Sequence, residues 1–116
     1  MRVFKITFIV SSICLLMSCT QDKIVEIPVE CPDPISFAQD VEPLFVTGCS
    51  TSGCHDAAAS AGYNLEGYSN ISTNATPILG VIRHETGTPM PFNGSKWSDA
   101  DIQTFQCWMD QGKLDN

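Results

Sequence analysis

The segment Cys49-Ser50-Thr51-Ser52-Gly53-Cys54-His55 brings two thiols and an imidazole together, and it constrains the chain more than any other feature. Cys-x-x-Cys-His is the sequence mark of covalent haem attachment, in which both sulfurs bond to the haem and the histidine binds iron. In this chain four residues separate Cys49 from Cys54. The longer spacer reaches the same attachment points only if Ser50–Gly53 bulges outward, and small polar residues suit such a loop.

Other chemistries of the two thiols are less well supported. A structural zinc site needs about four ligands, and sequence neighbours such as Cys54 and His55 rarely bind one ion. A thioredoxin-like pair requires Cys-x-x-Cys beside a strand-helix unit, and the chain has neither. A disulfide between Cys49 and Cys54 is the main alternative to haem attachment in an exported protein.

Residues 1–18 have the pattern of an export signal. Two basic residues precede an apolar run over residues 6–17, which is shorter than the roughly 20 residues of a membrane-spanning helix. The run ends in Leu-Met-Ser-Cys, which resembles a bacterial lipobox, where cleavage falls before a cysteine that carries lipid. We expect a lipoprotein signal over 1–18 and lipid on Cys19. The protein would then be anchored to a membrane of the cell envelope, at the periplasmic face or the cell surface.

Composition agrees with export and limits the partners. Six cysteines among 116 residues are typical of an oxidising compartment, and this length suits one small domain. Cleavage before Cys19 removes two basic residues and no acidic one, which leaves 4 basic and 13 acidic side chains and a formal charge of −9. Such a surface repels nucleic acid and favours a protein partner with a basic patch.

The mature chain divides into a tether and a domain. Residues 19–35 are polar, contain three prolines and lack helical periodicity, so we interpret them as a lipidated tether. Residues 36–116 form the domain. Its first helix is predicted from an apolar face over residues 37–45 that leads to Cys49; either it kinks at Pro43 or a new turn starts after Asp40, which can cap it.

Two further helices follow. Thr76 and Pro77 are typical of an N-cap and a first helical residue, and they predict a short helix to about Arg83. Ser98 and Gly112 are typical of the two ends of the last helix. Its apolar stripe is expected to pack across the first helix; the stripe consists of Ile102, Phe105, Trp108 and Met109.

The domain resembles a small c-type cytochrome domain, of the kind found in lipoproteins of Bacteroidetes-like bacteria. The matching features are Val41-x-Pro43-Leu44-Phe45 before the thiols, Cys54-His55, Leu65-x-x-Tyr68, Met90-Pro91, and Ser98 to Gly112 with Trp108. The resemblance implies an all-α fold, a cytochrome c-like helical domain wrapped around one covalent haem c. It implies His55 as the proximal iron ligand and Met90 as the distal one.

The residues themselves leave the distal ligand more open. Met90 stands between two prolines, which stiffen the loop that presents its sulfur. Met109 belongs to a helical stripe, where methionine usually fills a core. The alternatives to Met90 are Met109, His84 at a helix end, and an open sixth position.

Two further roles follow from the motif. Leu65 and Tyr68 are candidates for the wall of a haem pocket, or else ordinary core residues. If haem takes Cys49 and Cys54, and lipid takes Cys19, then Cys31 and Cys107 are left over. In an oxidising compartment we expect these two to form a disulfide; two buried free thiols are the alternative.

Histidine and methionine ligation fills both axial positions of a haem iron and raises its potential, which suits an electron carrier and not an enzyme. The leading hypothesis is therefore membrane-anchored electron transfer to a redox partner protein. Two alternatives remain. One is a haem enzyme or gas sensor with an open sixth position, and the other is a non-haem, disulfide-stabilised lipoprotein that acts as an interaction module.

Overall fold

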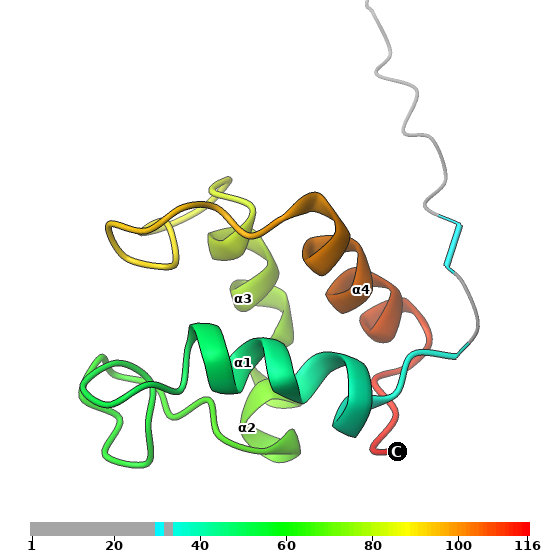
Figure 1. The fold of residues 1–116 in the computed structure, drawn as a ribbon, viewed down its shortest axis with the longest axis horizontal. Helices are drawn as coiled ribbons and strands as arrows, with labels where there is room; N and C mark the ends of the chain where they lie inside the picture. The colour runs from blue at the N-terminus through cyan, green and yellow to red at the C-terminus, as the bar shows by residue number, and fades with distance from the viewer. Residues whose placement is uncertain (1–29, 32–33) are drawn as a thin grey trace, which may run out of the picture.

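The computed structural model describes residues 30–31 and 34–116, and all regular structure in them is helical. The elements in chain order are the π-helical turn η1 (Phe37–Val41) and the α-helices α1 (Glu42–Gly48), α2 (Tyr68–Thr73), α3 (Ala75–Ile82) and α4 (Asp99–Asp110). Figure 1 shows η1 and α1 as one continuous rod, with the other helices gathered around it. The prediction of a small all-helical domain is confirmed.

The first helix begins with a π-helical turn because Pro43 follows. Ser36 Oγ accepts from the N–H of Gln39, and the Asp40 carboxylate accepts from the N–H of Ser36 at 2.8 Å. The N–H groups of Val41 and Glu42 bond to carbonyls five residues back. This wider turn precedes Pro43, whose ring crowds the preceding turn of a regular α-helix.

The expected cap on this helix was placed wrongly. Asp40 does not cap α1, because its carboxylate is engaged by Ser36 at the start of η1. The N-cap of α1 is Val41, which makes no side-chain capping bond. Pro43 lies in the first turn of α1, where a missing N–H removes no helical hydrogen bond.

The middle of the domain holds one helix more than the sequence analysis predicted. Helix α2 begins at Tyr68, in a segment for which the sequence analysis predicted no helix. The prediction of Thr76 as an N-cap was also wrong, since α3 already begins at Ala75 with Asn74 as its N-cap. The apolar residues Ile78 and Ile82 are buried as the periodicity predicted.

Helix α4 follows the sequence signals closely. Ser98 Oγ accepts from the N–H of Asp101 at 3.1 Å, which confirms the predicted cap. At the other end Gly112 has a φ of 94°, and the N–H groups of Gly112 and Lys113 donate to the carbonyls of Met109 and Trp108. This pair of bonds is the Schellman ending of a helix, which requires the left-handed conformation that glycine adopts most easily.

An aromatic core joins α4 to the first helix. Phe105 and Trp108 of α4 are fully buried, and their rings lie 5.3 Å from Phe45 and 5.6 Å from Phe37, respectively. The expected packing of the last helix across the first is confirmed. Because Phe45 precedes Cys49 by one helical turn, the core fixes the end of α1 from which the motif begins.

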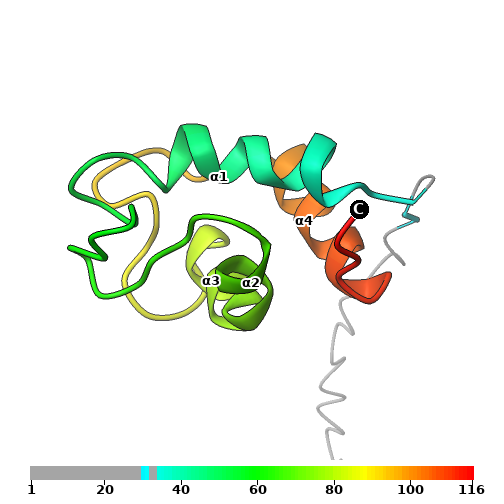
Figure 2. The ribbon, with the colours of Figure 1, turned by 90° about the horizontal axis from the view of Figure 1, so that it is seen from below.

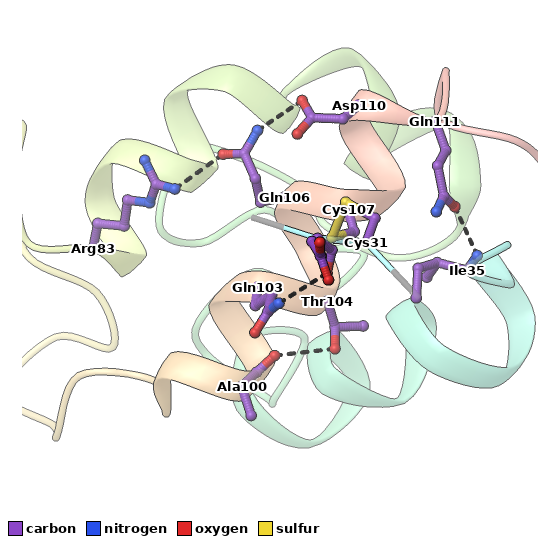
Figure 3. Close-up of a disulfide and its surroundings, with 11 residues drawn as sticks. Cys31, Ile35, Arg83, Ala100, Gln103, Thr104, Gln106, Cys107, Asp110 and Gln111 are labelled. Atoms are coloured by element: carbon purple, nitrogen blue, oxygen red, sulfur yellow. Dashed lines mark hydrogen bonds between the residues drawn. A yellow bond between two sulfur atoms is a disulfide. The ribbon is translucent and has the colours of Figure 1, made fainter. Parts of the chain in front are cut away.

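A disulfide joins Cys31 to Cys107 of α4, with the two Cα atoms 5.4 Å apart. These are the two cysteines that the sequence analysis left without a haem or lipid partner. Beside the disulfide, the side chain of Gln111 accepts a hydrogen bond from the N–H of Ile35 at 2.7 Å (Figure 3). Gln103 of α4 also donates to the carbonyl of Glu30 at 3.4 Å, so the segment before η1 is attached to α4 at three points.

The predicted signal over 1–18, the lipidation site at Cys19 and most of the tether lie outside the described residues. Among the residues that the structure describes, no helix is long and apolar enough to cross a membrane.

Removing the disulfide should destabilise the domain substantially. We expect Cys31→Ser combined with Cys107→Ala to lower the free energy of unfolding by about 2–4 kcal/mol, because the bond closes a long loop in the unfolded chain. Denaturant titration followed by circular dichroism measures this. Reduction of the unmodified protein is the matched control and should give a similar loss, whereas an unchanged midpoint in both samples would contradict the prediction.

Candidate functional site

The first thiol comes directly off the end of α1. Gly48 is the last residue of the helix, and the N–H groups of Cys49 and Ser50 both donate to the carbonyl of Phe45 at 2.8 Å. The indole of Trp97 lies against Gly48, where a Cβ would be 3.5 Å from Nε1. Cys49 is only 9% exposed. It is therefore a buried thiol fixed to a rigid element.

The spacer between the thiols folds back on itself. The N–H of His55 donates to the carbonyl of Cys49 at 3.1 Å, and the N–H of Cys54 donates to the carbonyl of Thr51 at 2.9 Å. In a regular α-helix the carbonyl of residue i accepts from residue i+4, which is the relation of the first cysteine to the histidine in Cys-x-x-Cys-His. Here the same two groups are joined with two more residues between them. Residues 51–53 are exposed, as expected of an outward bulge, but Ser50 is partly buried and its hydroxyl donates to the carbonyl of Leu65.

Asp56 fastens this bulge to the residues after the motif. Its carboxylate accepts from the N–H of Gly53 and from the N–H of Ala58, each at 3.1 Å. Gly53 has a φ of 82°, a left-handed conformation that costs glycine little. One side chain thus holds the last spacer residue on one side and the chain beyond His55 on the other.

The segment after the motif turns back and orients the imidazole. His55 Nδ1 lies 2.9 Å from the carbonyl oxygen of Tyr63, and the carbonyl of His55 accepts from the N–H of Leu65 at 2.9 Å. A carbonyl can only accept, so Nδ1 carries the proton in this contact and the Nε2 atom of a neutral ring is the basic one. Within residues 34–116, Nε2 makes no hydrogen bond. The half-buried ring is thus a preoriented ligand of the kind found in metal sites, where the second ring nitrogen donates to a carbonyl.

The two thiols are free and have different surroundings. No disulfide joins Cys49 to Cys54, and Cys54 is exposed whereas Cys49 is buried. Burial, reinforced by the neighbouring Cys54, raises the pKa of the Cys49 thiol from 9.0 to about 11.

Met90 lies on a second loop, which is attached to the end of α3. Its N–H donates to the carbonyl of Val81 at 3.0 Å, and its own carbonyl oxygen is 3.0 Å from Nε2 of His84. Met90 is partly buried. Figures 1 and 2 show that the loop with Met90 and the loop with Cys49–His55 lie at the same end of the domain.

The remaining predicted site residues divide between the site and the core. Leu65 is buried, and its carbonyl accepts from Ser50 Oγ at 2.8 Å, so it belongs to the framework of the motif. Tyr68 packs its ring against Phe37 at the start of η1, with a centroid distance of 5.3 Å. Its ring also packs against Trp108, and its hydroxyl donates to the carbonyl of Lys113 at 2.8 Å, so the contacts of Tyr68 are with the aromatic core and the C-terminal segment.

The other candidate for a sulfur ligand, Met109, packs at the edge of the core. This is the filling role that its place in a helical stripe suggests.

Among the described residues, no three His, Cys, Asp or Glu side chains form a cluster that could hold a metal ion. A pure side-chain site such as structural zinc would require one.

No protein family, curated protein or solved structure matches this chain.

Sequence reasoning missed three contributors to the site. Asp56 carries a signal that was available, because an aspartate before small residues often forms a turn with its own backbone. The Tyr63 carbonyl carries none, since any residue type supplies it. Trp97 carries no sequence signal either, because its contact with Gly48 is visible only in the three-dimensional structure.

In the haem-free protein, the two free thiols should react at very different rates. We expect iodoacetamide to alkylate Cys54 first, because Cys54 is exposed while the thiolate fraction of Cys49 at neutral pH is roughly a hundredfold below that of an ordinary cysteine. The rate at Cys49 should keep rising until the pH reaches about 11. Peptide mass mapping at several pH values measures both rates, with denatured protein as the control. Equal rates in the folded protein would contradict this assignment.

Proposed function

We propose that the domain carries one c-type haem, bonded to the sulfurs of Cys49 and Cys54, and transfers electrons. His55 would bind the iron through Nε2, and Met90 would bind it through its sulfur. The observation that carries the proposal is the hydrogen bond from the His55 N–H to the Cys49 carbonyl at 3.1 Å. It retains the backbone relation of a Cys-x-x-Cys-His turn while the spacer residues project into solvent.

The residues present fit this cofactor in three respects. Both thiols are free, as thioether formation requires. The His55 ring is held by the Tyr63 carbonyl at Nδ1, so its Nε2 lone pair is the one offered to iron. Met90 occupies a loop at the same end of the domain (Figure 2). A soft sulfur opposite an imidazole is a common axial pair in haem proteins that transfer electrons.

Electron transfer is preferred to catalysis because of what the chain provides. A bound haem would supply reversible one-electron chemistry, and two protein ligands would leave no iron position for a substrate. The chain's own residues position the groups that would bind the haem: α1 fixes Cys49, Asp56 fixes the spacer, and the Tyr63 carbonyl fixes His55.

The mature chain's excess of acidic over basic side chains suits a redox partner with a basic patch. Lipid on Cys19 would keep the domain at a membrane of the cell envelope. The Cys31–Cys107 disulfide accords with an oxidising compartment.

The ligand pair is tested with the full chain, coexpressed with a haem-maturation system. We expect a low-spin spectrum with a methionine-to-iron signature in the oxidised state. Met90→Ala should convert the haem to a high-spin form that binds carbon monoxide rapidly. Met109→Leu is the matched control and should leave the spectrum unchanged. A wild-type protein that is already high-spin would favour a gas sensor or haem enzyme, and one without haem would contradict the proposal.

The spacer is tested by shortening it. Deleting Thr51 and Ser52 creates a two-residue spacer and turns the His55-to-Cys49 bond into an ordinary helical i+4 bond. We expect covalent haem to be retained at a similar yield per chain, measured by haem staining and absorbance.

Replacing both residues with alanine keeps the spacer length and serves as the control. If haem attaches to the control but not to the shortened chain, the spacer residues do more than project from the motif, and the interpretation of the bulge is wrong.

A further inference from the structure

We propose that His84 is a positioning residue that holds Met90 in place for the iron, and not an iron ligand itself. The inference rests on the proposed function, because it assigns a role toward the same haem. It starts from one contact: Nε2 of His84 lies 3.0 Å from the carbonyl oxygen of Met90. A carbonyl can only accept, so the imidazole donates through Nε2. This nitrogen, which could otherwise compete with the Met90 sulfur for the iron, is thus occupied by the hydrogen bond to the Met90 loop.

The chain between α3 and Met90 is folded tightly onto the end of the helix. The carbonyl of Gly80 accepts from the N–H groups of Glu85 and Thr86, and a Cβ at Gly80 would collide with Oγ1 of Thr86. The next carbonyl, that of Val81, accepts from both His84 and Met90. The free carbonyls at the end of α3 are therefore the anchor of the whole loop.

His84 occupies the left-handed position at which α3 ends. Arg83 is the C-cap of α3, so His84 is the first residue beyond it, and its φ is 60°. Helices commonly end with a left-handed residue at this position; glycine or asparagine is the usual choice, and histidine is also enriched in this conformation. From this position the ring reaches the Met90 carbonyl.

The prolines on either side of Met90 stiffen the chain but do not tie it to the rest of the domain. Pro89 and Pro91 have no N–H, so neither donates a backbone hydrogen bond. The N–H of Met90 donates to Val81, and its carbonyl accepts from His84. Both polar groups of the Met90 backbone are thus bound to the end of α3. Without His84 one of these two attachments is lost.

The test uses two variants that separate the ring from the backbone. His84→Asn suits the left-handed conformation but is too short to reach the Met90 carbonyl, whereas His84→Gln restores a longer side-chain donor. In the haem-free chain we expect His84→Asn to speed amide exchange of Met90 by about fivefold, the loss of one exposed hydrogen bond, and His84→Gln to recover part of the protection. Glu85→Ala, in the same turn, should leave the exchange unchanged.

In the haem-bearing full chain, His84→Asn should keep the covalent haem but weaken the methionine-to-iron signature and speed carbon monoxide binding. The inference is overturned if His84→Asn alters neither the Met90 amide exchange nor the signature. It is also overturned if His84 itself proves to bind iron, or if the wild-type haem lacks the sulfur signature. A chain without haem would refute the proposed function, and the exchange of the Met90 amide would still decide whether His84 holds this residue.

Discussion

The candidate haem site depends on one backbone hydrogen bond, from the N–H of His55 to the carbonyl of Cys49. Cys49 lies at the end of α1 and His55 follows six residues later. The bond gives this pair the same backbone hydrogen bond that joins residues four apart in an α-helix. The extra residues need only a tolerant turn, which Gly53 supplies with its φ of 82° and Asp56 secures with its carboxylate. The extra spacer residues therefore lie on the solvent side of the motif, and the placement of Cys49 and His55 does not depend on the length of the spacer.

This bond is useful only if its two ends are held in place, and the rest of the domain does that. Phe45, one turn before Cys49, is locked by Phe105 of α4 and by Trp97. The same Trp97 ends the loop that contains Met90, so the loop is attached to α1 at one end and to α3 at the other. The disulfide between Cys31 and Cys107 attaches the incoming chain to α4 (Figure 3).

Features with local causes could be predicted from the sequence. Ser98 and Gly112 delimit α4 through caps that involve neighbouring residues, and the small residues of the spacer predicted its bulge. Features that depend on tertiary contacts could not. Helices α2 and α3 begin without a side-chain capping bond. Asn74 is of a type common at N-caps, but its side chain donates instead to the carbonyl of Asn70. Tyr68 was a candidate for the wall of a haem pocket or for the core, and in the structure its ring packs against Phe37 and its hydroxyl donates to the carbonyl of Lys113. His84 was considered as a helix-end residue and as an alternative iron ligand, but its bond to the Met90 carbonyl could not be foreseen because it depends on the fold of the loop.

The most direct measurement of the central claim is the mass of the proteolytic fragment that contains Cys49–His55. The fragment should come from full-length protein exported by a host with haem-maturation machinery, and it should be reduced before analysis. Thioether bonds survive reduction and disulfides do not. If haem is attached to both thiols, we expect a fragment heavier by one haem with no alkylatable thiol at Cys49 or Cys54. A fragment of unmodified mass with both thiols free to alkylate would contradict it.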